Sequence, residues 1–426
     1  MPNKKSIDSF LSNIIEISIL MILFCLPFSK TVVEICSTVA IVAFFAKKIF
    51  IERSIKLKVD RKVLIALFLF VLFNAISISN SQYVHLSLRA LFSKTLQWVL
   101  LFIIVADTIK TPERLRRVFI TMVFSVILIM TDAVYQMYFT GIDFLHYPNR
   151  YPAFHYYHRF HEPDNMFLVS AYPTASFPFP GDFAAWLNVY FFTFLLVTIS
   201  KLRKKKNIRI LAVALCILLA FFLYLCASQG ALVGSVFSVA LMLAVYRRKI
   251  IRPFVVALVI IIAIISLVPH LRVLFKEEML DVGASVSDRM NMWSTGWRIF
   301  KRHPLIGNGV NTFFQHFREF RTDEFQYKRG SYAHNCFLQM AADIGVFGLA
   351  AFLAFAFFVI TTSIKNSIKK LSMFRESFVF GLSLGLLAFL AHSFFDTNLY
   401  SLNLSALFWL GMGLVAGLGR GANETP

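Results

Sequence analysis

Two side chains in one polar segment of the sequence have the chemistry of a group-transfer site. His334 directly precedes an apolar helix, and an imidazole with a reference pKa near about 6.5 can accept a proton at neutral pH. Arg289 lies 45 residues earlier, and a guanidinium is suited to holding a phosphate. A base and an anion-binding group on one segment predict transfer of a group from an anionic leaving group to a hydroxyl.

Each of these two residues also has a simpler structural interpretation. A lone His near a helix start is usually a hydrogen-bonded structural residue. Arg289 begins a predicted helix over 287–302, on a face that also carries aromatic residues. Such a face fits a cleft with an anion at its end, or an interfacial helix with Trp at the level of the lipid headgroups.

Three weaker candidates for substrate binding, Tyr332, Arg318 and Arg321, lie nearby. The two arginines fall opposite an apolar face of the stretch 310–321, whose members are Phe313, Phe317 and Phe320. This amphipathic pattern predicts a helix that lies on the membrane surface. Contact with phosphates and a solvated basic face are the two interpretations of its arginines.

A second polar segment, 139–181, is rich in aromatic residues, Pro and His. Arg159 is its candidate for contact with a glycan or phosphate. The segment also contains His155, His158 and His161, a spacing that could hold a metal. No helical period would position these ligands, so an aromatic surface for sugars or headgroups is favoured. No metal site and no cofactor are predicted.

The rest of the chain indicates a membrane protein. Of 426 residues, 58% are hydrophobic and only 15% are charged, against about 25% charged residues in a soluble domain. The apolar residues fall in runs close to the ~20 residues that a helix needs to cross a bilayer. The sequence therefore predicts an all-α, polytopic fold with about twelve transmembrane helices. The expected spans are 10–28, 31–47, 63–79, 95–109, 118–138, 182–200, 208–228, 231–246, 253–269, 345–363, 378–395 and 404–419.

The distribution of charge orients these spans. Of the 43 Lys and Arg, 28 lie on one side together with seven acids, and the rest of the chain is nearly neutral. The positive-inside rule makes that side cytoplasmic and places both termini inside. The net charge of +20 is therefore an orientation signal, so nucleic acid is not expected as a partner, whereas membrane lipids are.

Two long outer segments interrupt the alternation of spans and short loops, and loops of such length usually serve a function. The second, 270–344, carries both Arg289 and His334. The predicted organisation is 1–138 (spans one to five), 139–181 (first periplasmic loop), 182–269 (spans six to nine), 270–344 (large periplasmic catalytic loop) and 345–426 (spans ten to twelve).

The order of several short motifs resembles the O-antigen ligase and O-antigen polymerase superfamily. The motifs are Arg-x3-Trp at 289–293, His-Pro-Leu-x-Gly-x-Gly at 303–309, His-Asn followed by Leu and two glycines at 334–349, and His-Ser-Phe-Phe-Asp at 392–396. The resemblance covers roughly 170–420, which is over half of the chain.

This resemblance implies transmembrane helices with a large periplasmic loop, similar to the GT-C-like glycosyltransferases, in a bacterial inner membrane. Members transfer a glycan from undecaprenyl pyrophosphate, without a nucleotide sugar or a divalent metal. Ligases pass the glycan to a hydroxyl of lipid A–core, and polymerases pass it to another carrier-linked repeat. By motif position, His334 and Arg289 match the catalytic His and Arg of the family. His392 and Asp396 match its C-terminal pattern, where they support the cavity or serve helix packing.

The sequence departs from the family at one position. The family usually has an Arg in a Ser-Arg-Gly turn between two middle spans, where this chain has Ser228-Gln229-Gly230. Gln229 can donate a hydrogen bond to phosphate, but charge-assisted bonds are about twice as strong. Arg318 or Arg321 is the expected replacement. The alternatives are a different donor or acceptor, or a diverged homologue with another task.

Three functions are compatible with these patterns. The leading interpretation is an O-antigen ligase-type glycosyltransferase, and an O-antigen or exopolysaccharide polymerase of the same superfamily is the alternative. A lipid-linked glycan transporter is a third interpretation. Transporters usually show repeat symmetry or paired broken helices, and the sequence shows neither.

Overall fold

The computed structural model describes residues 4–54, 56–57, 59–140, 142–145, 172–200, 206–245, 287–321 and 331–419. These residues form helices and connecting loops without a strand, so the predicted all-α class is confirmed. The principal helices are α1 (Lys4–Cys25), α2 (Lys30–Ala46), α3 (Arg61–Ser77), α4 (Val84–Ala90), α5 (Gln97–Thr108), α6 (Pro112–Tyr135), α8 (Pro180–Ser200), α9 (Lys206–Leu225), α10 (Gln229–Val245), α13 (Phe313–Phe320), α14 (Cys336–Ile368), α15 (Phe374–His392) and α16 (Leu402–Leu418). A further helix covers 287–302, as predicted.

Seven described segments are long and apolar enough to cross a membrane: Lys4–Cys25, Arg61–Asn80, Val84–Thr108, Pro112–Phe139, Pro180–Ile199, Cys336–Ile368 and Phe374–His392. Shorter apolar helices cover Val213–Leu225, Gln229–Val245 and Leu402–Leu418. The expected span 253–269 lies outside the described residues. The total of twelve spans and the periplasmic position of the large loop therefore stay predictions.

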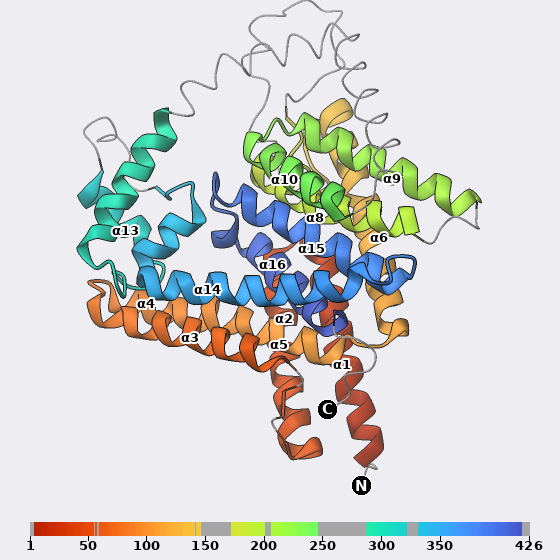
Figure 1. The fold of residues 1–426 in the computed structure, drawn as a ribbon, viewed down its shortest axis with the longest axis horizontal. Coiled ribbons are helices and arrows are strands. Elements are labelled where there is room, and N and C mark those ends of the chain that lie inside the picture. The colour runs from red at the N-terminus through yellow and green to blue at the C-terminus, as the bar shows by residue number, and fades with distance from the viewer. Residues whose placement is uncertain are drawn as a thin grey trace, which may run out of the picture.

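Two groups of helices build the body of the molecule. In the first, α14 runs alongside α3 (Figure 1), and the rings of Phe70 and Phe352 lie 5.7 Å apart between them. In the second, α15 packs against both α8 and α10. α16 contacts α5, α14 and α15 and so joins the two groups. The loop between α15 and α16 therefore lies where both groups can contribute to a site.

One expected span begins earlier than the sequence predicted. The span placed at 95–109 starts at Val84 and includes α4, a π-helix at Leu91–Leu96 (η3) and α5. Arg89 and Lys94, which the sequence placed in an outer loop, therefore lie within a candidate membrane helix. Ionisable residues in such helices are costly and rare, so their position needs a reason.

α14 is not one continuous helix, because its backbone leaves the helical conformation at Gly345 (φ 74°, ψ 177°). A break of this kind frees backbone groups that would be costly to leave unpaired in a membrane. The turn over 304–309 provides their partners: Asn308 and Gly309 donate backbone N–H groups to the carbonyls of Ala342 and Asp343, both at 3.0 Å. Beyond the break, the Val346 N–H donates to the carbonyl of Pro304 at 2.9 Å.

The backbone of the 304–309 turn touches the backbone of α14 at the break, and this close contact requires a glycine on each side, Gly307 in the turn and Gly345 in α14. A Cβ on Gly307 would lie 2.2 Å from the carbonyl oxygen of Asp343, and one on Gly345 would lie 2.1 Å from that of Leu305. Both residues also have positive φ, which side chains with a Cβ disfavour. The turn therefore locks the 287–321 region onto the broken helix.

The 287–302 helix and α13 form a small lobe with its own core. Met292 and Ile299 of the first helix are buried with Phe313 and Phe317 of the second, beside Ala342 of α14. The helix predicted over 310–321 is thus present, but its apolar face is not free to lie on the membrane surface. That interpretation was wrong because the periodicity shows only that a face is apolar and does not say what covers it.

We expect Gly345→Ala to lower the free energy of unfolding by at least about 2 kcal/mol, since it adds both a disfavoured backbone conformation and a clash. Thermal unfolding in detergent, followed by tryptophan fluorescence, measures this change. Gly411→Ala in α16 is the matched control, because its Cβ would meet only a Leu386 side-chain carbon at 3.0 Å. Equal melting temperatures for the two variants would contradict the role given to the break.

Candidate active site

His334 is positioned by the start of α14. Asn335 caps this helix, accepting the N–H groups of Phe337 and Leu338 through its side chain at 3.0 Å. His334, the residue before the cap, has a φ of 46°, in the left-handed region that is uncommon for a residue with a Cβ. The Cys336 N–H donates to the carbonyl of Ser393 at 2.8 Å. The helix start is therefore fastened to the loop that follows α15.

That loop brings a carboxylate to His334. The Asp396 Oδ1 atom lies 3.3 Å from the His334 Nδ1, and its Oδ2 lies 3.8 Å from the Nε2 of His392. Burial by itself would raise the pKa of Asp396, but the hydrogen bond from His334 and the charges of His392 and His334 outweigh it and lower that pKa to about 2. Asp396 is therefore ionised at neutral pH and holds one ring nitrogen of His334.

The turn at the start of α10 contacts His392, the second histidine beside Asp396. The hydroxyl of Ser228 lies 3.2 Å from the Nε2 of His392. A Cβ on Gly230 would lie 2.6 Å from the Cδ2 of the same ring, so only glycine allows this approach. His392 thus packs between the 228–230 turn and Asp396, which explains why the C-terminal motif carries two residues of the site.

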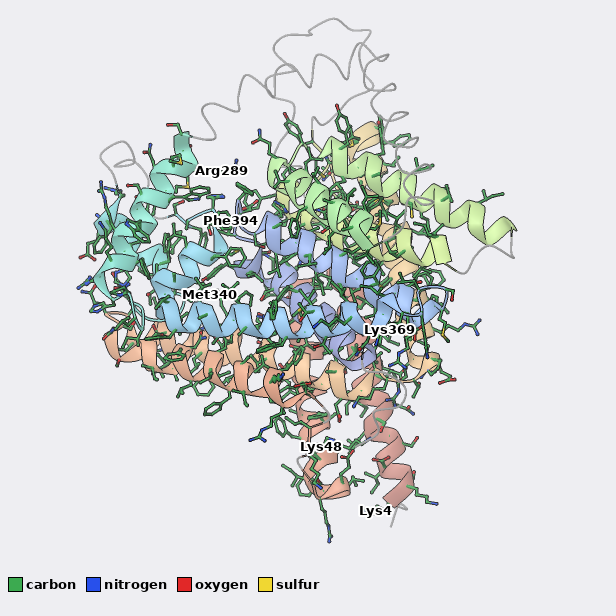
Figure 2. All side chains as sticks on the ribbon, viewed as in Figure 1. Lys4, Lys48, Arg289, Met340, Lys369 and Phe394 are labelled. Carbon is green, nitrogen blue, oxygen red and sulfur yellow. The ribbon has the colours of Figure 1, made fainter. Side chains whose placement is uncertain are left out.

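Aromatic contacts place Arg289 at the same site. The Trp293 ring, one helical turn further along, lies 6.3 Å from Phe394 and 6.4 Å from Phe395, measured between ring centroids. Its indole N–H donates to the carbonyl of His334 at 3.5 Å. Figure 2 shows Arg289 at the end of its helix, on the side of Phe394. The aromatic face predicted for this helix therefore packs on the loop after α15, and Arg289 extends over the site.

A cavity of about 700 Å³ collects these groups. Five of the residues singled out in the sequence line it: Arg289, His334, Gln229, Tyr332 and Asp396. Burial and the charge of Asp343 raise the pKa of Tyr332, which keeps its hydroxyl protonated as a donor. The structure thus brings together residues from the helix at 287–302, the start of α14 and the start of α10.

The cavity also contains charged residues that sequence reasoning missed. Lys30, the first residue of α2, lines it, as does Asp182 in the first turn of α8. Their signal in the sequence was weak: each is a single charge beside an apolar run, compatible with an ordinary helix end. Only the packing of α2 and α8 around the loop after α15 reveals that both face one space.

Other sequence candidates do not line this cavity. Arg318 is exposed on α13, and Arg321 follows that helix. Arg159 and the histidines at 155–161 lie outside the described residues. Away from the cavity, a further carboxylate, that of Asp132, is buried at the end of α6, where it accepts the Phe144 N–H at 2.7 Å and the Ser176 hydroxyl at 2.6 Å. Its role in this structure is to fasten the ends of the first outer segment.

One family model matches the part of the chain that holds three of the residues described above. Residues 214–353, about a third of the chain, match the model of the O-antigen ligase family. The matched range includes Gln229, Arg289 and His334, whereas Asp396 and Lys30 lie outside it. This match confirms the resemblance drawn from the motifs and supports an assignment to the O-antigen ligase superfamily. A search of curated proteins found no similar sequence.

The Asp396→Asn variant tests, through its dependence on pH, the contact between the ionised Asp396 carboxylate and His334. Because the pKa of Asp396 falls from 3.8 to about 2 on folding, its stabilisation is complete above about pH 4 and is lost as the pH falls through about 2. We expect wild type to exceed the variant by about 2 kcal/mol in free energy of unfolding at pH 5, with the gap closing toward pH 2. Unfolding in detergent across this pH range measures the difference in free energy of unfolding. A difference that does not depend on pH would contradict an ionised Asp396 carboxylate.

Proposed function

We propose that this protein is an O-antigen ligase-type glycosyltransferase of the bacterial inner membrane. It moves a glycan from undecaprenyl pyrophosphate to a hydroxyl of an acceptor such as lipid A–core at the periplasmic face, and both termini are cytoplasmic. The observation that carries the proposal is one cavity lined by His334, Arg289 and Gln229, within a chain whose 214–353 segment matches the O-antigen ligase family.

The geometry of His334 suits a general base. A carboxylate accepts hydrogen bonds, so Asp396 holds the tautomer with its proton on Nδ1 and leaves the lone pair of Nε2 for the acceptor hydroxyl. As the acceptor oxygen bonds to the anomeric carbon, its proton passes to Nε2 and the bond from that carbon to the pyrophosphate oxygen breaks. The negative charge of Asp396 then stabilises the imidazolium that forms.

The leaving group needs positive charge, and Arg289 with Lys30 supplies it. Undecaprenyl pyrophosphate gains negative charge as the glycosidic bond breaks, and preorganised cations stabilise that charge. Among the described residues, none forms an ion pair with the Arg289 guanidinium, which leaves it for a substrate anion. Lys30 lines the same cavity as Gln229, so it replaces the charge that the family usually places in the 228–230 turn. The proposal needs neither a cofactor nor a metal.

Deletion of the gene in the source bacterium distinguishes the ligase from the polymerase. Loss of a ligase leaves bare lipid A–core while carrier-linked polymer accumulates, whereas loss of a polymerase leaves core with a single repeat. Gel separation of lipopolysaccharide measures both outcomes. Unchanged lipopolysaccharide would contradict both functions and favour another polysaccharide or transport.

Complementation of that strain tests the base. We expect His334→Ala to lower transfer by about 10²- to 10⁴-fold while the protein stays in the membrane fraction. His85→Ala, an exposed histidine of α4 outside the cavity, is the control and should restore wild-type lipopolysaccharide. Normal lipopolysaccharide in His334→Ala cells would refute the assignment.

Lys30→Gln tests the replacement cation. Loss of a charged contact to phosphate should raise the KM for the lipid-linked donor by roughly 10- to 100-fold, measured with purified protein at saturating acceptor. Adding Gln229→Arg to this variant, which restores the family's usual residue, should recover most of the loss. An unchanged donor KM in Lys30→Gln would show that Lys30 does not hold the pyrophosphate.

A further inference from the structure

A second cavity, of about 580 Å³, adjoins the first. Lys30, Tyr400 and Ser401 line both, so the two spaces meet at the loop before α16 and the start of α2. The second cavity extends from this junction to α4, η3 and the break in α14. It does not include His334 or Arg289, and nothing in the function proposed above assigns it a ligand.

The walls of this cavity carry an excess of usable positive charge. Lys30, Arg89 and Lys94 line it, and its acids are Glu34 and Asp343. Asp343 already accepts the N–H groups of Thr312 and Phe313 at 3.2 and 2.9 Å and the Tyr400 hydroxyl at 3.4 Å. The carboxylate of Asp343 is thus occupied by protein donors, and the cations outnumber the remaining acid.

The α4–η3 segment supplies two of these cations, and a hydrogen bond holds one of them in place. Lys94 lies in η3, and π-helical turns occur frequently at functional sites. Its ammonium donates to the side-chain oxygen of Asn311 at 3.1 Å, which ties η3 to the lobe that carries Arg289. Arg89 lies one turn earlier, and no described residue forms an ion pair with it. Placing two cations within a candidate membrane helix is energetically costly, and a bound anionic ligand would offset that cost.

Part of the cavity lining is aromatic. Trp98, Trp409 and Phe352 line it and are nearly fully buried. A lining that combines cations with aromatic rings suits a ligand with a ring-shaped, weakly polar body and an anionic substituent. An oligosaccharide that carries a phosphate or a carboxylate has both features.

We infer that this second cavity binds the acceptor glycan and that Arg89 and Lys94 recognise a phosphate group on that glycan. The inference rests on the proposed function, because a transfer reaction needs two substrates and a cavity of about 700 Å³ has the size for one. The junction suits the reaction: Tyr332, two residues from the base, lies 6.5 Å from Tyr400 between ring centroids. An acceptor in the second cavity therefore presents its hydroxyl at the Tyr400 junction, on the side of the first cavity that holds His334.

The experiment measures binding without donor, so that it does not depend on catalysis. Purified protein in nanodiscs of neutral lipid is titrated with de-acylated lipid A–core oligosaccharide, either intact or treated with phosphatase. We expect Arg89→Gln/Lys94→Gln to bind the intact oligosaccharide at least tenfold more weakly than wild type. Phosphatase treatment should weaken wild type equally and leave the double variant unchanged.

The control is Arg298→Gln, an exposed arginine in the 287–302 helix that lines neither cavity, and it should bind as wild type does. Equal affinity of wild type and double variant would overturn the inference. So would a loss that is the same for intact and phosphatase-treated oligosaccharide, since the cations would then not read the anionic group.

A lipid headgroup offers the same anionic chemistry, and nanodiscs with anionic lipid distinguish the two sources. If anionic lipid reduces wild-type binding to the level of the double variant, the cations hold a headgroup and the acceptor assignment fails. Binding that is independent of lipid charge supports the acceptor. A transfer assay on wild type is a separate measurement. Binding as expected without any transfer would contradict the proposed function but not the anion site.

Discussion

The break in α14 at Gly345 leaves backbone groups without helical partners, and the 304–309 turn pairs with them on both sides of the break. The site depends on this exchange of hydrogen bonds. The turn belongs to the same lobe as the 287–302 helix, so fastening it to α14 fixes Arg289 relative to His334. The Asp343 carboxylate adds to the connection, because it caps α13 and accepts the Tyr400 hydroxyl. In a membrane, the backbone groups freed at the break must find partners within the protein, because no water is present to replace a lost hydrogen bond.

A second set of contacts connects the 287–302 helix and the start of α14 to the loop that contains Asp396. The loop after α15 is held by the start of α14 through a backbone hydrogen bond and by the 287–302 helix through the Trp293 ring. Asp396 sits in this loop and holds His334, while His392 packs against the 228–230 turn. His334, Arg289 and the 228–230 turn therefore form one connected unit, although they come from three parts of the chain.

Much of this was accessible from the sequence. The all-α class and the 287–302 helix followed from hydropathy and helix signals, and motif order selected His334 and Arg289 as candidates that share one cavity in the structure. The missed residues are informative. Lys30 was an unremarkable charge at a helix start, and Arg89 and Lys94 looked like residues of an outer loop. Arg318 and Arg321 seemed better replacements for the missing Arg, but neither lines a cavity.

The sequence by itself determined which segments are apolar enough for the membrane, which side carries the excess charge, and which short motifs carry chemistry. These properties are local, since they depend on composition and spacing within a few turns of helix. Only the tertiary structure decided which charges share a space. The convergence of α2, α8, α10 and the α15–α16 loop on one cavity, and of α4 and η3 on its neighbour, depends on contacts between residues hundreds of positions apart. No local pattern records such contacts, because each helix presents the same apolar face whatever packs against it.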